Sequence, residues 1–369
     1  MSGGTGVSTY ASTLRDALQS CGANVGFAGG EDLQKHPHVL QNKLFRFLTS
    51  LRGQQQLTFF QPEHLWGVSD FFRKVQVHFS TFGRLTAVSS TYMPDIVHWS
   101  YPFPMYWEGI PNIYTIHDLI PLLHPELTGI RSDRMRQILW QCMQRATAIV
   151  TVSDAVQQDI AALFPEYSHK VVVLGQAVSV SYNQKEKNSS SDEDDKCFLY
   201  FGSIEKRKNI ARLIEAHGQS GTSRPLRLLG NNGFGAQEEL AALERHPRPA
   251  LVQQVAWCER ECLLAQVQNA CAVLFPSLAE GFGLPIVESM ALGTPVMTSD
   301  RHATQEIAGQ AALLVDPYNI SEMAKAISIL DRNAAVRRDL TANGLLRAQA
   351  FSMDTYARRI AGFYESLRG

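Results

Sequence analysis

Short apolar runs alternate with amphipathic stretches along most of the chain, which is the pattern typical of a parallel α/β sheet. A first series of runs predicts strands at Asp95–His98, Ile113–Ile116, Ala148–Val152 and Lys170–Leu174. A second series predicts strands at Cys197–Phe201, Leu226–Leu229, Leu251–Gln254, Ala272–Phe275 and Pro295–Thr298. The stretches between them predict helices, for example at Val7–Ser20, Ser132–Arg145, Asp154–Leu163, Asn209–Gly218 and Leu284–Leu292.

A polar segment separates the two series. Residues 183–196 read N-Q-K-E-K-N-S-S-S-D-E-D-D-K and contain no apolar anchor, so they predict a loop near a domain boundary. We therefore expect two Rossmann-like domains, over residues 1–183 and 184–353, that face a central cleft, with residues 354–369 as a C-terminal helix. Ligands of such sheets bind at the carboxyl ends of the strands.

Composition narrows the class of protein. The 369 residues carry a formal net charge of -1, and 45% are hydrophobic and 19% charged, so no overall field favours nucleic acid. No apolar run reaches the roughly 20 residues of a membrane span. The six cysteines are scattered, and Cys258 with Cys262 is too small a set for zinc, so we expect reduced thiols, a cytoplasmic protein, and neither a metal nor a cofactor.

The start of the chain is unusual for this class. The segment Gly3-Gly4-Thr5-Gly6 leads directly into the first predicted helix, whereas a Gly-rich loop at that position normally follows a strand. Either the sheet lacks its first strand or the recorded start lies downstream of the native one, and we favour the second interpretation.

The most informative stretch runs from Phe275 to Thr298, F-P-S-L-A-E-G-F-G-L-P-I-V-E-S-M-A-L-G-T-P-V-M-T. A loop with Glu280, Gly281, Phe282 and Gly283 leads into a helix that begins at about Leu284 and carries Glu288. Backbone N–H groups at such a helix start can bind phosphate, and the two carboxylates can face one ligand from its two ends.

This stretch, E-G-F-G-L-P-I-V-E, resembles the E-x7-E motif of retaining glycosyltransferases with the GT-B fold, notably glycosyltransferase family 4. The resemblance extends over nearly the whole chain. It implies that Glu280 contacts the hydroxyls of a donor sugar, that Glu288 contacts the ribose of the nucleotide, and that the C-terminal helix crosses back to the first domain.

A basic cluster follows the first strand of the second domain, in F-G-S-I-E-K-R-K-N. Lys206, Arg207 and Lys208 would lie at a strand's carboxyl end, where fixed cations stabilise the charge of a leaving diphosphate. The family usually has an arginine directly after the glycine, where this chain has Ser203, so we expect Arg207 to take that role beside Lys208.

The first domain contributes weaker signals. By resemblance, Gly4 and Gly6 lie near the diphosphate, and His117, in T-I-H-D-L at the end of a predicted strand, contacts the donor sugar. Ser153-Asp154 is interpreted mainly as a helix cap, with a role in the cleft as the lesser alternative.

Residues 37–90 carry six basic and two acidic side chains interleaved with aromatic ones. Such a stretch can dock on an anionic membrane surface, which would place the protein peripherally at the inner face of the cell membrane. The alternative is an ordinary helix that buries its apolar face.

The expected activity is transfer of a hexose from a nucleotide-sugar to a glycan or lipid-linked acceptor, with GDP-mannose as the first candidate donor and UDP-sugars as alternatives. By resemblance, the leaving phosphate accepts the proton of the acceptor hydroxyl. A nucleotide-sugar epimerase, a phosphorylase and a non-catalytic nucleotide-sugar sensor stay as alternatives, because fold alone does not fix function.

Overall fold

The second half of the chain is built on a six-stranded parallel sheet in the order β12-β11-β10-β13-β14-β15. The computed structural model describes residues 6–29, 49–61, 64–180 and 196–367. The strands of this sheet are short and apolar, and most of their side chains are buried, as expected for a sheet covered on both faces. Their bounds are Phe198–Phe201 (β10), Leu226–Leu229 (β11), Val252–Val255 (β12), Ala272–Phe275 (β13), Val296–Ser299 (β14) and Leu313–Val315 (β15).

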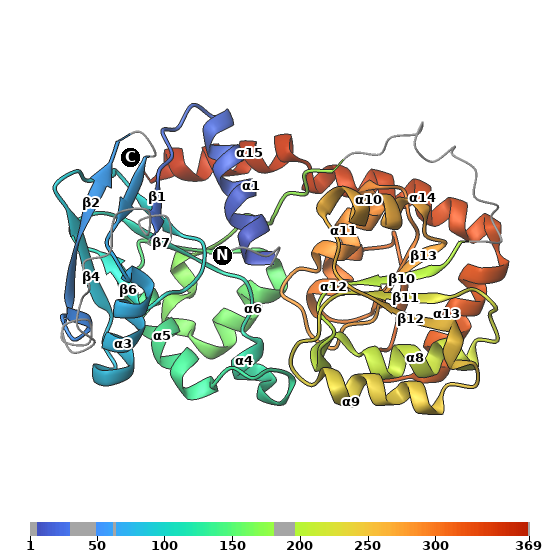
Figure 1. The fold of residues 1–369 in the computed structure, drawn as a ribbon. Coiled ribbons are helices and arrows are strands. Elements are labelled where there is room, and N and C mark those ends of the chain that lie inside the picture. The colour runs from blue at the N-terminus through green and yellow to red at the C-terminus, as the bar shows by residue number, and fades with distance from the viewer. Residues whose placement is uncertain (1–5, 30–48, 62–63, 181–195, 368–369) are drawn as a thin grey trace.

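Helices cover both faces of this sheet (Figure 1). One group comprises α8 (Ile210–Gln219), α9 (Ala236–Leu240) and α13 (Ile320–Arg332). The other group comprises α10 (Arg260–Asn269), α11 (Leu284–Ala291) and α14 (Ala334–Ala348), and the short α12 (His302–Ala308) faces the first half of the chain. This arrangement confirms a Rossmann-like second domain.

The first half contains a parallel sheet in the order β5-β7-β8-β9. Its strands are Val97–Trp99 (β5), Asn112–Ile116 (β7), Ala148–Thr151 (β8) and Val171–Val173 (β9). Helices α1 (Gly6–Ser20), α4 (Ile120–Leu123), α5 (Ser132–Arg145) and α6 (Asp154–Leu163) accompany it. Strand β9 is shorter than the predicted Lys170–Leu174, because Lys170 ends a 3-10 helix and its ammonium donates to the carbonyl oxygen of Ala146 at the end of α5.

A second sheet in this half, in the order β1-β3-β2-β4-β6, was not predicted. Its strands are Phe27–Gly29 (β1), Gln54–Phe60 (β2), Leu65–Gly67 (β3), Thr86–Ser90 (β4) and Met105–Trp107 (β6), with α3 (Phe71–Phe82) between β3 and β4. Three of these strands are three residues long, and β2 starts with three glutamines, so none gives a continuous apolar run.

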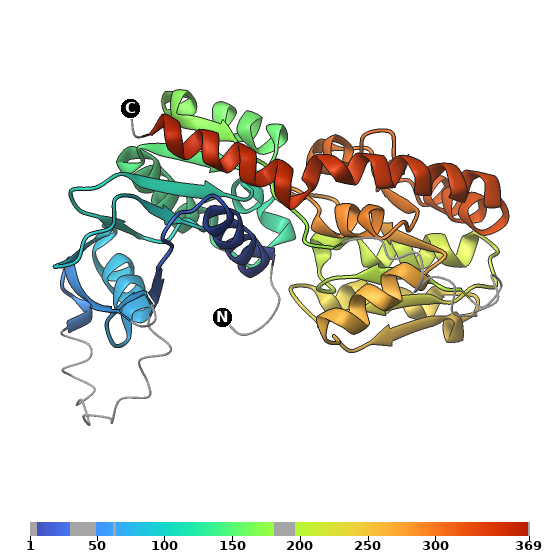
Figure 2. The ribbon, with the colours of Figure 1, turned by 90° about the horizontal axis from the view of Figure 1, so that it is seen from above.

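The chain crosses between the two halves at two places that lie side by side. The first crossing follows β9, and the second leads from α14 through a 3-10 turn (Gln349–Phe351) into α15 (Met353–Ser366). The backbone N–H of Val178 in the first crossing donates to the carbonyl oxygen of Phe351 in the second, at 2.9 Å. Figure 2 shows α15 continuing the line of α14 onto the first half, where it packs against α1.

Helix α15 also enters a hydrogen-bonded chain in the first half. The Tyr364 hydroxyl is 2.6 Å from Nδ1 of His98, and Nε2 of His98 is 2.7 Å from Oγ1 of Thr115. The Tyr10 hydroxyl of α1 lies 2.8 Å from the same Thr115 oxygen. Burial, with a smaller contribution from His117, lowers the pKa of His98 to about 3, so its imidazole is neutral. The C-terminal helix is thus linked through Tyr364 and His98 to Thr115 of β7, the strand that directly precedes His117.

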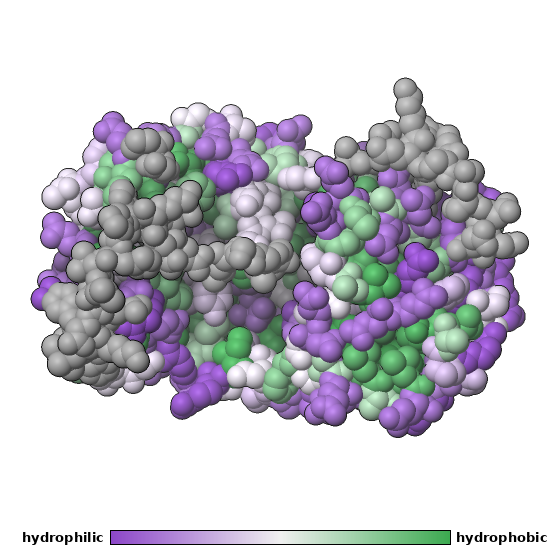
Figure 3. All heavy atoms as spheres, viewed as in Figure 1, coloured by the Kyte–Doolittle hydropathy of each residue, from purple (hydrophilic) through white to green (hydrophobic). Residues whose placement is uncertain are grey.

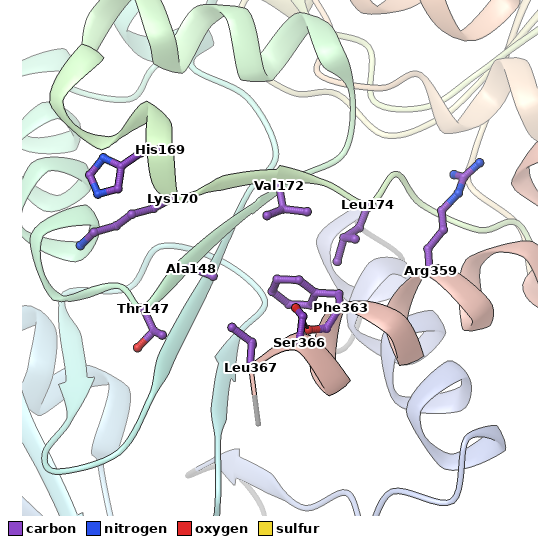
Figure 4. A pocket seen from close by; sticks show the side chains of 10 residues that line it. All are labelled: Thr147, Ala148, His169, Lys170, Val172, Leu174, Arg359, Phe363, Ser366 and Leu367. Atoms are coloured by element: carbon purple, nitrogen blue, oxygen red, sulfur yellow. Dashed lines mark hydrogen bonds between the residues drawn. The ribbon is translucent and has the colours of Figure 1, made fainter. Parts of the chain in front are cut away.

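A cavity of about 440 Å³ lies where α15 meets the edge of the first sheet (Figure 4). None of the predicted site residues lines it. Its lining residues are Thr147, Ala148, His169, Lys170, Val172, Leu174, Arg359, Phe363, Ser366 and Leu367. On the face seen in Figure 3, polar and apolar side chains are interspersed, and the surface is hollowed where the two halves meet.

The basic stretch of residues 37–90 lies only partly within the described residues. Residues 30–48, which include Lys43, Phe45 and Arg46, fall outside them. In α3, Phe71 is buried in the core, whereas Phe72 is exposed, so part of the apolar set in this stretch has a packing role. No helix within the described ranges has both the length and the apolar character needed to cross a membrane.

Two buried histidines of the second half form a fully paired network. His246 accepts a hydrogen bond at Nδ1 from the backbone N–H of Arg248, so its Nε2 carries the proton and donates to Nδ1 of His217 at 3.0 Å. Nε2 of His217 in turn donates to the carbonyl oxygen of Arg224 at 2.9 Å. Burial is the main cause that lowers the pKa of His217 to about 4, and it also lowers the pKa of His246.

This network predicts a loss of stability in mild acid. Because the folded-state pKa of His217 lies below its unfolded value of 6.5, the folded protein binds fewer protons, and stability present above pH 6.5 is lost as the pH falls toward 4. We expect His217 to account for about 2 kcal/mol of the fall in the free energy of unfolding between pH 7.5 and 5. Urea denaturation of His217→Gln should show a smaller pH dependence than the wild type. The exposed control His169→Gln should not, and equal slopes for all three proteins would contradict the assignment.

Candidate active site

The two predicted ligand loops of the second half follow adjacent strands, β10 and β13, so their ends meet at one edge of the sheet. After β10, Lys206, Arg207 and Lys208 form a single 3-10 turn. The turn ends at Asn209, which has a φ of 63° and whose amide donates to the carbonyl oxygens of Pro276 and Pro317. The N–H of Leu278, in the loop after β13, donates to the carbonyl oxygen of Arg207 at 2.7 Å. The two loops are therefore held to each other by backbone and side-chain hydrogen bonds.

Glu280 lies between the two cations of this turn. Its Oε2 is 2.8 Å from an Arg207 guanidinium nitrogen, and its Oε1 accepts from the Lys208 ammonium. Arg207 also pairs with Glu205 at 2.7 Å, and the Lys208 ammonium lies over the ring of Phe275 at 4.6 Å from its centroid. The predicted carboxylate and the two predicted cations thus form one cluster.

Glu280 and Lys208 are buried and Arg207 is half-buried, so the charges of this cluster depend on one another. Burial alone would raise the pKa of Glu280, but the charges of Arg207 and Lys208 outweigh burial and hold that pKa below its ordinary value. The pKa of Arg207 is raised, because Glu280 and Glu205 outweigh the effect of burial. Glu280 is therefore ionised near neutral pH, and the three groups form a fixed array of charge in a region with little water.

Glu288 forms a second, separate carboxylate site. It is the fifth residue of α11 and is 5% exposed. Its Oε1 is 2.5 Å from the guanidinium of Arg260 at the start of α10. Burial raises the pKa of Glu288, and the charge of Arg260 partly opposes this shift. The two glutamates of the motif thus pair with different cations, one with the β10 loop and one with α10.

His117 directly follows β7 and belongs to the part of the first half that meets this cluster. Its Nε2 lies 2.8 Å from the carbonyl oxygen of Ser100, which can only accept, so Nε2 carries the proton and Nδ1 can accept a hydrogen bond. Burial lowers the pKa of His117 despite its Ser100 and Asp118 neighbours, so the ring is neutral. The edge of the ring meets Tyr10 at 4.8 Å between centroids.

The backbones of His117 and Gly281 are in direct contact. A Cβ at Gly281 would lie 1.7 Å from the carbonyl oxygen of His117, so no larger residue fits at that position. Asp118, the residue after His117, feels the charges of both Arg207 and Glu280, although burial is the main cause of its raised pKa. The structure therefore brings His117, Arg207, Lys208 and Glu280 together across the junction of the two halves.

The remaining predicted residues fall at different places in this site. Gly6 begins α1, and a Cβ there would lie 3.7 Å from the side chain of Leu284, at the start of α11. Gly283 caps α11 with a φ of 95°, and Phe282 is buried against Phe351, so only the Phe282 backbone is available to a ligand. Gly4 lies outside the described residues.

Two of the predicted donor-binding residues, Ser203 and Lys206, lie in the loop after β10. Ser203 is exposed, and its hydroxyl donates to Glu205 at 2.9 Å. Lys206 is exposed, and among the described residues its ammonium forms no ion pair with the carboxylates of the cluster, in contrast to Arg207 and Lys208. Both lie at the rim of the cluster.

Sequence reasoning missed the partners of the predicted groups. Glu205 directly precedes the basic turn, so its pairing with Arg207 could have been suspected from i, i+2 charges in the turn. Arg260 is 28 positions from Glu288, and no local pattern indicates that pairing. Within the described ranges, no three His, Cys, Asp or Glu side chains are placed to bind a metal, and the six cysteines are free thiols.

Comparisons with known proteins agree with this geometry. A family model described as Glycosyltransferase Family 4 matches residues 4–182, and a model described as Glycosyl transferases group 1 matches residues 181–347. The chain is 28% identical over 273 residues to O-antigen chain mannosyltransferase B of Escherichia coli, which covers 69% of this chain and 70% of that protein. It is also 28% identical over 221 residues to the O-antigen chain mannosyltransferase RfbU of Salmonella typhimurium, over 59% of this chain and 60% of that protein.

Solved structures show the same fold. Sucrose-phosphate synthase from Thermosynechococcus elongatus superposes with a TM-score of 0.72 at 18% identity, over 98% of this chain and 94% of that chain. Anabaena HepE in complex with UDP-glucose superposes with a TM-score of 0.58 at 17% identity, over 92% of this chain and 98% of that chain.

The fold and the two matching models define the class: the chain is a glycosyltransferase with two Rossmann-like domains, the GT-B fold. It belongs to glycosyltransferase family 4: the family 4 model matches its first half, and the model of group 1 glycosyl transferases matches its second half. The predicted fold, family and enzyme class are therefore confirmed.

The buried cluster predicts a stability change that needs no substrate. Glu280→Gln leaves the buried Lys208 without its counter-ion and the half-buried Arg207 with Glu205 alone, so the free energy of unfolding should fall by about 3 kcal/mol. The control Glu205→Gln removes a carboxylate that touches only Arg207 of the two cations, and it should cost clearly less. Urea denaturation at pH 7.5 measures both, and an unchanged stability of Glu280→Gln would contradict the buried ionised state.

Proposed function

We propose that this glycosyltransferase transfers a mannosyl group from GDP-mannose to a glycan or lipid-linked acceptor and retains the anomeric configuration. The observation that carries this proposal is the buried cluster of Arg207, Lys208 and Glu280, with the His117 backbone against Gly281. A sugar diphosphate placed between the halves would meet cations at its phosphates, a carboxylate at its sugar and a neutral imidazole beside it.

The proposed roles follow from the charge of each group. As the bond from the sugar to the diphosphate breaks, negative charge develops on the phosphates, and Arg207 and Lys208 stabilise it. Glu280 accepts hydrogen bonds from sugar hydroxyls, and Nδ1 of His117 can accept another. The leaving phosphate takes the proton of the acceptor hydroxyl on the same face of the sugar. No cofactor enters this proposal.

Glu288 and Arg260 are proposed to hold the nucleotide. The ribose diol can donate to the Glu288 carboxylate, whose raised pKa reflects its burial. The E. coli and Salmonella relatives are named as O-antigen chain mannosyltransferases, which supports mannose and polysaccharide assembly. Solved Anabaena HepE complexes contain UDP or UDP-glucose, so the experiment compares GDP and UDP ligands directly.

Nucleotide binding is tested by thermal shift with GDP, GDP-mannose, UDP, UDP-glucose and UDP-N-acetylglucosamine. A ligand at 100 times its dissociation constant should add about 2.7 kcal/mol of stability. We expect the shift with the GDP ligands, its loss in Glu288→Ala, and its retention in Glu365→Ala, an exposed glutamate of α15. A shift with the UDP ligands alone would mean that the donor is a UDP-sugar and not GDP-mannose. No shift with any nucleotide would contradict the proposed function.

Transfer itself is tested with the donor found in that screen and an acceptor oligosaccharide. Lys208→Met should lower kcat by about 10²–10³, because it removes a fixed cation that acts on the developing phosphate charge. NMR of the first product should show the same anomeric configuration as the donor. An inverted product would contradict the retaining mechanism, and a kcat unchanged in Lys208→Met would contradict the role of that cation.

A further inference from the structure

The N-terminus of α6, in the first domain, lies against α12 and the Glu280 loop of the second domain (Figure 1). Helix α6 has ten residues, and its first N–H groups have no partner within the helix. The carboxylate of Glu306 in α12 supplies those partners. Its Oε1 accepts from the N–H of Asp154 at 2.9 Å and its Oε2 from the N–H of Ala155 at 2.8 Å. A helix of one domain is thus capped by a side chain of the other.

Ser153 provides a second contact between the domains at the same helix end. Its Oγ accepts from the N–H of Val156 at 3.2 Å, which is the local cap that the sequence predicted. Its single hydroxyl hydrogen is donated to the carbonyl oxygen of Gly281 at 2.7 Å. Ser153 is 1% exposed, so water does not replace either partner while the domains are in contact.

His302 gives a third contact, from the first residue of α12. Its Nε2 lies 3.1 Å from the carboxylate of Asp159 in α6, and its Nδ1 lies 3.4 Å from the carbonyl oxygen of Glu280. Its backbone has a φ of 49°, which is unusual for a residue other than glycine. The hydrogen bond with Asp159 raises the pKa of His302, which favours the charged form of the pair.

These contacts converge on the peptide segment that carries Glu280. The carbonyl oxygen of Glu280 faces His302, and the carbonyl oxygen of the next residue, Gly281, accepts from Ser153. The side chain of Glu280 meanwhile pairs with Arg207 and Lys208 of its own domain. The second domain therefore sets where the carboxylate is held, and the first domain acts on the backbone of this loop through Ser153.

We propose that Ser153, Glu306 and His302 form an interdomain latch that positions the Glu280–Gly281 loop for sugar transfer only when the two domains are in contact. The proposal rests on the proposed sugar transfer, in which Glu280 contacts the donor sugar. The three are positioning residues, because they act through the loop and through α6. Opening the domains breaks the bonds from Glu306 to α6, from Ser153 to Gly281 and from His302 to Asp159, and it leaves the ion cluster of Glu280 intact.

The proposed latch predicts one effect on catalysis and one on nucleotide binding. In the closed protein, the loop is aligned and water is excluded from the donor, so weakening the latch should lower kcat and raise the fraction of donor hydrolysed. Nucleotide binding uses groups of the second domain, so the dissociation constant for the nucleoside diphosphate should change little. A purely structural role would not divide these quantities in this way.

The test compares Ser153→Ala and Glu306→Gln with two control variants. Ser352→Ala removes a serine cap that accepts from Thr355 at the start of α15, and Asn333→Ala removes an asparagine that caps two N–H groups of α14 within the second domain. We expect each latch variant to lower kcat about tenfold, the loss of one hydrogen bond to a charged or buried group, with nucleotide affinity within twofold of the wild type. Both controls should keep the wild-type kcat.

Small-angle scattering gives a readout that does not depend on activity. Each latch variant should have a larger radius of gyration than the wild type and the controls. Wild-type kcat and radius of gyration in both latch variants would overturn the latch, as would an equal loss of kcat in the controls. If the wild-type protein transfers no sugar, the proposed function fails, and the scattering comparison alone still decides whether these residues hold the domains together.

Discussion

The structure of the site depends on one constraint: a carboxylate that is 8% exposed must be accompanied by positive charge. Glu280 meets this requirement through Arg207 and Lys208, and its pKa stays below the ordinary value as a result. The cations come from the loop after β10 and the acid from the loop after β13. Because these strands are neighbours, the fold brings the charges together without any long connection.

The sequence predicts the elements that carry this cluster well, since each strand before a loop is a continuous apolar run. Helices Ser132–Arg145 and Asp154–Leu163 and strands Leu226–Leu229 and Ala272–Phe275 have the predicted bounds. The second sheet of the first half was missed, because strands such as Leu65–Gly67 are too short to show a period. A pattern of period two needs more residues than such strands contain.

The predicted residues of the site were found from local motifs, and their partners were not. The pairings of Glu288 with Arg260 and of Ser153 with Gly281 join positions that are 28 and 128 residues apart. The first pairing depends on how α10 and α11 are placed within the second domain, the second depends on how the two domains meet, and no local pattern encodes either. Ser153 illustrates this limit, since its local cap was predicted and its second bond belongs to the interface.

The pair of chain crossings has a mechanical consequence. Val178 and Phe351 lie in different crossings and are joined by a backbone hydrogen bond, so both covalent connections lie at one place, where a rotation between the halves would pivot. In a rigid-body rotation about such a pivot, atoms far from it move furthest and atoms close to it move little. Phe351 also packs against Phe282, so the motif loop is held at the pivot by Phe282, while Gly281 contacts Ser153 of the opposite domain. Because Gly281 bonds to Ser153 of the other half, a rotation between the halves changes that contact directly.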